Sequence, residues 1–347
     1  MKKKPLFILI TDTHLNHKNI ELVIDIFRQA IEQAQKLGLK VIYHAGDLFD
    51  SRKHQTLATL RAFAEILLMC EEAGIVLRAI PGNHDKPDYF SANSYLDVYE
   101  RYGSLELVRE WASFKEGDYY VHMIPFFDER EVYPHYLSKA AFVKGFKNIL
   151  ITHIAVDGVR NNDGSEIENT FDKKAFKKFE KVLVGHYHNA QEVGNVAYVG
   201  SAYQKDYGED DDKGMTLVYD DGSLERILLD FPRFETIKID LNVVTTEELE
   251  KTFKSHEKSE DNIRFKFSGT KEKLAALDRP KYIKAGIDVK TEQDDPEIDL
   301  DYAELVDFTG FSKAKILDEW GEFSEKHEID ENIEKAGKIR LEKTFNE

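Results

Sequence analysis

The chain opens with three apolar, strand-like runs that alternate with two amphipathic patterns, and this order limits the fold more than any other feature. The apolar runs cover 6–11, 40–47 and 75–83. Apolar residues at helical spacing, each time closed by a glycine, cover 20–38 and 54–74. Strands that are joined by crossover helices lie parallel in one sheet. The sequence therefore predicts an α/β fold that begins with a β-α-β-α-β unit.

The next part of the chain is rich in strands and poor in helical patterns. Its apolar stretches predict four further strands and a hairpin, at 119–126, 148–153, 181–186, 196–201 and 214–230. The hairpin turn at Asp221-Gly222 is typical of such a connection. Because there is little room for crossover helices, we expect these strands in a mixed or antiparallel sheet. Two packed sheets flanked by helices would accommodate all of them.

The pattern changes again after residue 232. Strand-like runs and short helical patterns alternate there, over 234–241, 245–256, 262–269, 271–278 and 283–291. This order predicts a small α+β unit. A charged helical tail with few apolar positions, such as the one that ends the chain, usually solvates one face or docks on a partner. We expect three parts: a main domain over 1–232, an α+β cap over 233–291, and an acidic linker with a helical tail over 292–347.

Charge and cysteine content limit the classes of function. The net charge is −17, whereas a free-standing nucleic-acid binder usually carries a basic surface. A polyanionic substrate would therefore need bound metal ions, a local basic patch or a partner. The single cysteine, Cys70, excludes an intrachain disulfide and fits a reducing compartment. No apolar run suits a signal peptide or approaches the ~20 residues of a membrane span. We expect a cytoplasmic protein.

Polar clusters follow the predicted strands and supply candidate metal ligands. The residues are Asp12, His14, Asp47, Asn83, His153, His186 and His188. Polar groups that follow buried strands of an α/β sheet converge at its carboxyl edge. Carboxylate, imidazole and amide donors without a thiolate suit Mn²⁺, Fe²⁺, Zn²⁺ or Mg²⁺. Seven donors are too many for one ion with open positions but suffice for two, with a carboxylate between them.

Each cluster alone has an ordinary explanation. An Asp-x-His pair is common by chance, and His153 could be a satisfied polar residue at a strand end. The Gly-Asn-His-Asp stretch suits a turn, and His186 and His188 could lie on an exposed hairpin. Their succession, each after a predicted strand, favours one shared site. His44 stays open because it lies three residues before Asp47.

The motifs Asp-x-His, Gly-Asp-x-x-Asp, Gly-Asn-His-Asp, His and Gly-His-x-His, in this order, resemble those of the binuclear metallophosphoesterases. The resemblance covers 6–230. Within this superfamily the chain is most similar to SbcD-type DNA repair and recombination nucleases, including phage recombination nuclease subunits. The similarity rests on "HAGDLFDSRK", on "GSAYQKDYGEDDDKG" and on "RFETIKIDL", which opens a small cap. It implies a two-sheet sandwich flanked by helices, with an α+β capping domain.

The resemblance also implies roles for the candidate residues. One ion would be held by Asp12, His14, Asp47 and His188, and the other by Asp47, Asn83, His153 and His186. Asp47 would then bridge the two ions. By the same similarity, His84 would stabilise the transition state and protonate the leaving oxygen, while Asp85 would hydrogen-bond to His84 and orient it. Mn²⁺ is the expected metal, with Mg²⁺ as the alternative.

The implied function is metal-dependent hydrolysis of DNA, as an exonuclease on double-stranded ends and an endonuclease on single strands. The implied partner is an SbcC-like coiled-coil ABC-type ATPase, for which 302–345 would be the docking element. Family members pair as homodimers, and the apolar stretch 57–69 and a helix expected near 91–101 are candidates for that contact. Some family members have His where this chain has Asp50, so the exonuclease balance cannot be carried over.

Two other functions remain open at this point. The first is a phosphatase or small-molecule phosphodiesterase of the same superfamily. The Ser/Thr phosphatases, however, carry Arg directly after the second Asp of Gly-Asp-x-x-Asp, where this chain has Ser51. The second is a scaffold that kept the fold without catalysis. Scaffold members tend to lose ligands, and this chain retains all seven.

Overall fold

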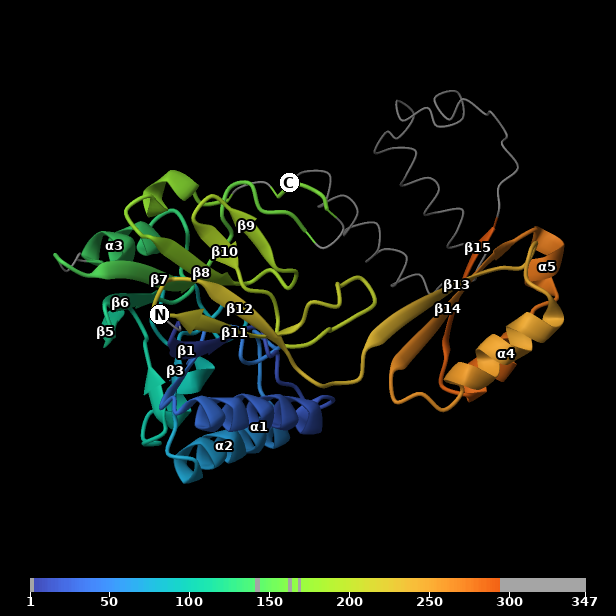
Figure 1. Cartoon of the computed structure of the whole chain (residues 1–347), viewed down its shortest axis with the longest axis horizontal. Coiled ribbons are helices and arrows are strands. Elements are labelled where there is room, and N and C mark those ends of the chain that lie inside the picture. The colour runs from blue at the N-terminus through green and yellow to red at the C-terminus, as the bar shows by residue number, and fades with distance from the viewer. Residues whose placement is uncertain (1–2, 141–143, 162–163, 168–169, 294–347) are drawn as a thin grey trace, which may run out of the picture.

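The main body of the chain is a sandwich of two sheets in the computed structural model, which describes residues 3–140, 144–161, 164–167 and 170–293 (Figure 1). Among these residues the first sheet has six strands in the order β12-β11-β1-β2-β3-β4. In that order their bounds are Leu224–Leu228, Gly214–Tyr219, Pro5–Ile10, Val41–His44, Val76–Ala79 and Leu105–Leu107. The strands β1 to β4 are parallel and β11 runs antiparallel to β1, so this sheet is mixed.

The second sheet is also mixed and has the order β5-β6-β7-β8-β10-β9 in the described part of the chain. The bounds are Ala112–Glu116, Tyr119–Ile124, Lys147–His153, Lys181–Gly185, Val196–Tyr198 and Gln191–Val193. Its central strands β6, β7, β8 and β10 are parallel, and the two edge strands are antiparallel to their neighbours. The predicted two-sheet α/β fold is confirmed. Because the parallel strands of each sheet share a direction, their carboxyl ends meet at one edge of that sheet.

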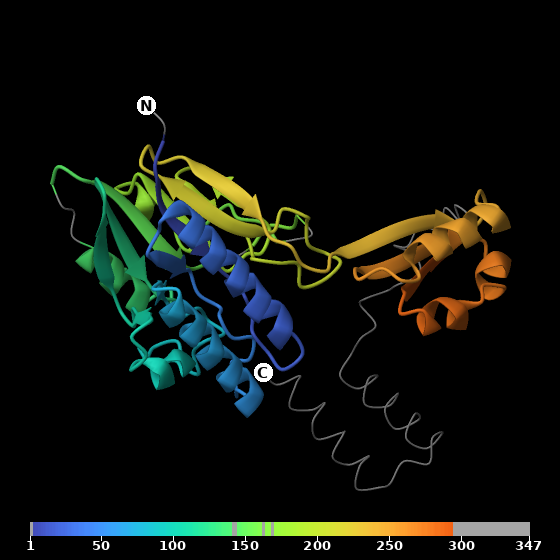
Figure 2. The same cartoon turned by 60° about the horizontal axis from the view of Figure 1, so that its bottom comes forward.

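Apolar side chains from both sheets fill the space between them. Phe7, Tyr43, Val121 and Ile151 belong to this buried cluster. Helices α1 (Ile20–Leu37) and α2 (Leu57–Glu72) lie side by side on the outer face of the first sheet (Figure 2) and bury a second cluster there. A third cluster covers the outer face of the second sheet, beneath α3 (Val132–Lys139) and the short 3₁₀ helix η2 (Lys173–Phe176).

Two predicted helices are shorter than the sequence pattern indicated. Helix α2 begins at Leu57 because the hydroxyl of Thr56 accepts the Thr59 amide hydrogen bond and caps the helix, so the preceding three residues lie outside it. The helix expected over 91–101 is only the 3₁₀ helix η1 (Tyr95–Tyr99), whose first turn is closed by a capping box from Ser94.

A small α+β unit follows the sandwich and lies to one side of it in both views (Figures 1 and 2). In the described chain it consists of three parallel strands, which are β13 (Phe234–Asp240), β14 (Asn262–Gly269) and β15 (Asp288–Gln293), with the helices α4 (Thr246–His256), α5 (Lys271–Ala275) and α6 (Arg279–Lys284). We refer to residues 233–293 as the cap. It has an apolar core of its own, which includes Phe265 and Phe267.

The end of the cap differs from the sequence prediction. Residues 283–287, predicted as the start of a strand, complete α6 and the turn after it, and β15 begins only at Asp288. The cause is local, because the carboxylate of Asp278 accepts the Lys281 amide hydrogen bond and starts a helix that the apolar pattern did not show. The predicted tail and most of the predicted linker lie outside the described residues. None of the helices described is long and apolar enough to cross a membrane.

One loop of the sandwich, residues 199–213 between β10 and β11, contacts the cap directly. The Tyr207 ring packs edge-on against Phe234. The guanidinium of Arg264 lies over the Tyr207 ring, 3.7 Å from its centroid. The Phe234 amide donates a hydrogen bond of 2.9 Å to Gln204 Oε1. We call this segment the β10–β11 loop; it connects the cap to the polar edge described next.

Candidate metal centre

Seven side chains with metal-binding atoms meet where strands of the two sheets end. They follow β1, β2, β3 and β8, or form the last residue of β7: Asp12, His14, Asp47, Asn83, His153, His186 and His188. All were predicted as ligands from the sequence. Their side-chain atoms form two groups that share a boundary at Asp47.

The first group consists of Asp12, His14 and His188, with potential ligand atoms within 4.8 Å of one another. His14 Nε2 lies 3.0 Å from His188 Nε2 and 3.8 Å from Asp12 Oδ1. His188 Nε2 lies 3.9 Å from the same carboxylate oxygen. Two imidazole nitrogens and a buried carboxylate therefore face one common point.

The second group consists of Asp47, His153 and His186, joined by the amide oxygen of Asn83. Asn83 Oδ1 lies 3.1 Å from His153 Nε2 and 2.9 Å from His186 Nδ1. Asp47 Oδ2 lies 3.3 Å from His153 Nε2 and 3.7 Å from His14 Nε2 of the first group. The Asp47 carboxylate thus lies between the two groups.

The backbone at this edge is strained. Among the described residues, Asp12, His14, Asp47 and His186 are the non-glycine residues with positive φ, at 53°, 42°, 54° and 93°. A side chain rarely adopts this left-handed conformation, which costs on the order of 1–3 kcal/mol each time. All four are predicted ligands. Such a concentration of strain is typical of a site in which function, and not stability, decides the geometry.

Burial sets the charge of the imidazoles. It lowers the pKa of His14 to about 4 and that of His186 to about 3, so both are neutral at pH 7 and offer a lone pair. For His153, burial also opposes the charged form, but the adjacent Asp47 carboxylate raises its pKa to about 9. The pKa of Asp47 is held well below its ordinary value by His153, although burial acts in the opposite direction. The site therefore favours a positive charge between these two side chains.

Two imidazoles are hydrogen-bonded through the nitrogen that faces away from the groups. His188 Nδ1 lies 2.5 Å from Glu209 Oε1, whereas His14 Nδ1 faces Asp50 Oδ1 at 3.4 Å without a hydrogen bond to any described residue. His153 Nδ1 lies 2.8 Å from the carbonyl oxygen of Ala45. An acceptor at this position fixes the tautomer and the ring orientation of a metal-binding histidine.

The predicted hydrogen bond between Asp85 and His84 is wrong. The buried Asp85 carboxylate instead accepts hydrogen bonds from the backbone amides of Leu48, Phe49 and Gly82, at 2.7–3.1 Å. These three donors occupy its oxygens, so Asp85 ties the loop after β2 to the loop after β3. It is part of the scaffold of the site.

His84 is oriented by a different group. Its Nδ1 lies 2.5 Å from the backbone carbonyl oxygen of Asp50, and its Nε2 lies 3.3 Å from Arg52 Nη2. The half-buried His84 ring lies edge-on to His14, with 4.9 Å between ring centroids. His84 therefore stands beside the first group, with Nε2 on the side of Arg52.

Gly82 leaves room for the Asp47 side chain. A Cβ atom at this position would lie 2.2 Å from Asp47 Oδ1 and 2.3 Å from the Asp47 backbone nitrogen. The same Oδ1 accepts a hydrogen bond of 2.8 Å from the His84 amide. The loops after β2 and β3 can pack this closely only because residue 82 has no side chain.

Comparison with known proteins decides the family. The family model described as calcineurin-like phosphoesterase matches residues 5–205, which is more than half of the chain. The chain belongs to the calcineurin-like phosphoesterase family. All seven predicted ligands and His84 lie within the matched residues.

The relatives of this calcineurin-like phosphoesterase include proteins of DNA metabolism. It is 26% identical over 194 residues to exonuclease subunit 1 of Enterobacteria phage T4, covering 54% of this chain and 55% of that protein. It is 32% identical over 174 residues to the DNA double-strand break repair protein Mre11 of Saccharolobus solfataricus, covering 45% and 42%. The chain thus spans about half the length of these curated relatives. A solved dimetal phosphatase from Danio rerio matches with a TM-score of 0.42 at 12% identity, covering 62% of this chain and 93% of that one.

Calcineurin-like phosphoesterases use two divalent metal ions, and the residues of this chain fit such a pair. The donors are imidazole nitrogens, carboxylates and one amide oxygen, a mixed set that suits Mn²⁺, Fe²⁺, Zn²⁺ or Mg²⁺. The neutral imidazoles of His14 and His186 offer lone pairs, and the left-handed backbone at four ligands holds their side chains together. The two groups, with Asp47 between them, therefore offer enough donor atoms for two ions.

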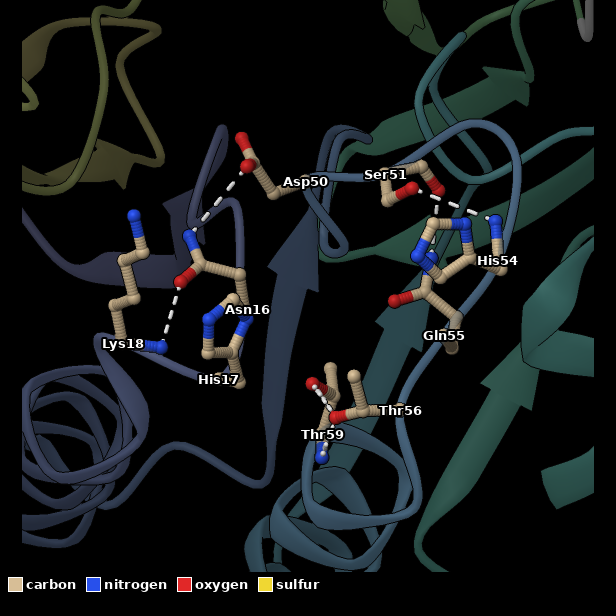
Figure 3. A pocket seen from close by; sticks show the side chains of 9 residues that line it. All are labelled: Asn16, His17, Lys18, Asp50, Ser51, His54, Gln55, Thr56 and Thr59. Carbon is tan, nitrogen blue, oxygen red and sulfur yellow. Dashed lines mark hydrogen bonds between the residues drawn. The ribbon is translucent and has the colours of Figure 1, made fainter.

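A pocket of about 230 Å³ opens beside this centre (Figure 3). Asp50 contributes to its wall and faces His14 from the other side. Asn16 lies across from Asp50 and donates a hydrogen bond of 3.4 Å to Oδ2. The rest of the lining consists of His17, Lys18, Ser51, His54, Gln55, the α2 cap Thr56, and Thr59 in the first turn of α2. All the lining residues have polar side chains, and Asp50 connects the pocket to the phosphoesterase centre.

The sequence did not indicate two residues that contribute to the site, Glu209 and Lys213, and it left the roles of Asp50 and His44 open. Glu209 and the buried Lys213 lie in "GSAYQKDYGEDDDKG", which served only as a family resemblance, although a glutamate four residues before a lysine could have indicated a buried pair. Asp50, whose role was open, contacts His14 and Lys205 Nζ. His44, also open, lies in neither ligand group; its Nε2 is 3.2 Å from Thr13 Oγ1.

Proposed function

We propose that this calcineurin-like phosphoesterase is a metal-dependent DNA nuclease that hydrolyses phosphodiester bonds. The observation that carries the proposal is the pair of ligand groups with Asp47 between them and His84 beside them. Two divalent ions bound there would supply positive charge for a phosphate and would acidify a water molecule. The names of the relatives, an exonuclease subunit and a double-strand break repair protein, support DNA as the substrate.

In this proposal His84 acts on the leaving oxygen. The Asp50 carbonyl accepts a hydrogen bond from Nδ1–H, so Nε2 is the nitrogen that can carry and release a second proton. Arg52, 3.3 Å from that nitrogen, adds positive charge where the leaving oxygen becomes negative. The pocket lined by Asp50 and Lys18 has room for the part of the strand next to the scissile phosphate.

We further propose Mn²⁺ as the metal, because imidazole and oxygen donors contribute in comparable number. The seven ligands are assigned as the resemblance implied: Asp12, His14, Asp47 and His188 for one ion, and Asp47, Asn83, His153 and His186 for the other. The distances within the two groups support this division. A cytoplasmic location, in a bacterium or a phage-infected host, fits the buried single cysteine.

The proposed assembly is a homodimer with a coiled-coil ABC-type ATPase. A net charge of −17 opposes DNA binding by the chain alone, and a partner would supply the missing positive surface. We keep the prediction that 302–345 docks this ATPase; these residues lie outside the described part of the chain. A chain that lacks 302–347 should no longer co-purify with the ATPase, and an unchanged complex would refute this docking role.

End-labelled linear double-stranded DNA with Mn²⁺ tests the catalytic proposal. The intact chain should degrade the DNA, and His84→Ala should abolish this degradation. A generic aryl phosphate monoester is the comparison substrate. Turnover of the aryl phosphate with the DNA left intact would favour the alternative, a phosphatase or small-molecule phosphodiesterase of the same superfamily. Inactivity on both substrates, with the ATPase also present, would favour a scaffold.

A further inference from the structure

Glu209 is a buried carboxylate that the seven-ligand site does not include. It belongs to the β10–β11 loop, outside the residues matched by the family model, and its side chain is 1% exposed. Oε1 lies 2.5 Å from His188 Nδ1. Oε2 accepts hydrogen bonds from the Lys205 amide at 3.2 Å and from Ser201 Oγ at 3.5 Å. Both carboxylate oxygens are therefore held in place, and one of them is directed at a predicted ligand.

Lys213 holds the same histidine from a second side. Its ammonium group is fully buried and donates hydrogen bonds of 2.6 Å to the His188 carbonyl oxygen and 2.9 Å to Asn189 Oδ1. It also lies 3.4 Å from Glu209 Oε2 and 3.3 Å from Asp210 Oδ1. A buried ammonium is costly unless it is paired, and here the pairing joins the His188 backbone to the carboxylate that faces its ring.

This arrangement determines which nitrogen of His188 is free. Nδ1–H donates to the Glu209 carboxylate, so Nε2 keeps its lone pair, and Nε2 is the atom that faces His14 and Asp12. In the second group, His153 Nδ1 is instead backed by the neutral carbonyl of Ala45. A carboxylate behind an imidazole raises its basicity as a ligand more than a carbonyl does.

We propose that Glu209, held by Lys213, is the positioning residue that fixes the His188 ring and sets the affinity of the Asp12–His14–His188 group for its divalent ion. The inference rests on the proposed function only in that the two groups bind metal. Glu209 touches neither the ion nor the substrate. The other group shares Asp47, but Glu209 contacts none of its side chains, so its affinity should stay nearly unchanged.

Titration of the metal-free full chain with Mn²⁺, followed by the electron paramagnetic resonance of the free ion, tests this proposal. The unmodified chain should bind two ions. In Glu209→Gln one ion should bind about 10–100-fold more weakly, while the affinity for the other stays within about twofold. The matched control is Asp210→Asn, which also removes an acidic group next to Lys213 but lies on its exposed side, and should bind both ions normally.

Two outcomes would overturn the proposal. Unchanged affinity for both ions in Glu209→Gln would show that the carboxylate does not act through His188, and equal weakening of both would indicate a general collapse of the loop. If Glu209→Gln does not fold, Glu209→Asp keeps the charge but shortens its reach, and the same selective loss is expected. A chain that binds two ions with the predicted dependence on Glu209 but does not cleave DNA would refute the proposed function alone.

A spectroscopic readout separates positioning from a merely structural role. In the diamagnetic zinc-loaded chain with ¹⁵N-labelled histidine, His188 should give an Nδ1–H proton resonance displaced strongly downfield by the short bond to Glu209. Glu209→Gln should move this resonance upfield and leave those of His14 and His153 in place. An unmoved His188 resonance would contradict the proposal.

Discussion

Asp47 occupies the point on which both ligand groups depend, and a glycine on the neighbouring loop gives it space. Gly82→Ala would place a methyl group against Asp47 Oδ1. We expect turnover of DNA to fall about a hundredfold, because Asp47 lies between the two groups and its displacement by about 1 Å disturbs both. Gly103→Ala is the matched control, since no atom lies within 4 Å of the added Cβ. Equal activity of the two variants would contradict this view of the site.

His84 should matter for turnover and not for metal binding. His84→Ala removes the ring whose Nδ1 is held by the Asp50 carbonyl, but none of the seven predicted ligands. We expect kcat on DNA to fall about 10²–10⁴-fold, the usual contribution of a general acid. The number of Mn²⁺ ions bound and their affinities should not change. A parallel loss of metal would assign His84 to the ligands instead.

Lys86 predicts a dependence of stability on pH. Its ammonium group donates to the Phe126 carbonyl, lies 3.6 Å over the Phe127 ring and is fully buried, and burial lowers its pKa to about 7. Above pH 7 the folded chain loses this proton while the unfolded chain, with an ordinary lysine pKa, keeps it. The free energy of unfolding should therefore rise from pH 7 to 9, by at most about 1.4 kcal/mol per pH unit.

The Lys86 prediction is checked by urea unfolding at several pH values. Lys86→Met should remove this contribution to the slope. Lys36→Met changes the same charge at an exposed position of α1 and should leave the slope unchanged. An identical slope with and without Lys86 would show that the buried amine keeps its proton in the folded state over this pH range.

At the scale of single residues, sequence was informative about ligands and uninformative about what holds them. Asp12, His14 and the other predicted ligands each lie at or just after the end of a buried strand, and this pattern can be recognised in the sequence alone. Asp85 directly follows His84, so a hydrogen bond between them was natural to expect. Its carboxylate instead accepts hydrogen bonds from three backbone amides, two of them on the loop after β2 and one, that of Gly82, on its own loop. Such backbone donors have no sequence signature.

At the scale of elements, α2 is the candidate dimer contact. Leu57 and Leu68 lie about three turns apart on one face of the helix and are 72% and 50% exposed. Val98 of η1 is 70% exposed. Exposed apolar groups of this size favour a covered surface. The 3₁₀ form of η1, shorter than the predicted helix, leaves α2 as the main element of this proposed interface.

Leu68→Arg tests the proposed dimer. A charge in the centre of an apolar contact is costly to bury, so the variant should be monomeric by light scattering at micromolar concentration while the unmodified chain is dimeric. Val243→Arg is the control, because Val243 is equally apolar and 78% exposed but lies in the cap. A monomeric unmodified chain would refute the dimer itself.

The elements that sequence predicted well are those with strong periodicity. Strands β1, β7 and β14 and helix α1 lie within one residue of their predicted bounds. Helix α6 was missed because it spans only Arg279–Lys284 and its start depends on one capping carboxylate. A six-residue helix shows less than two full turns, which is too little for a periodic pattern to emerge from the apolar residues alone.

At the scale of the whole molecule, the cap should fold independently. A fragment comprising 233–293 contains the complete buried cluster around Phe265 and Phe267 and all three strands of its sheet. We expect a cooperative urea transition with a free energy of unfolding of a few kcal/mol, as is usual for so small a domain. Phe265→Ala should abolish it, because losing a buried phenyl ring costs about 3–5 kcal/mol. A fragment without a transition would refute the proposed domain boundary.

The β10–β11 loop has a consequence for the molecule as a whole. The Tyr207 ring of this loop packs against Phe234 and Arg264 of the cap. Glu209 of the same loop contacts His188 in the first ligand group. If a macromolecule that binds the cap shifts this loop, it alters the affinity of the Asp12–His14–His188 group for a divalent cation. Thermodynamic reciprocity then requires the converse: the cation changes the affinity of the cap for that macromolecule by the same factor. Manganese concentration would in this way govern recognition at a surface that contains no ligand of the ion.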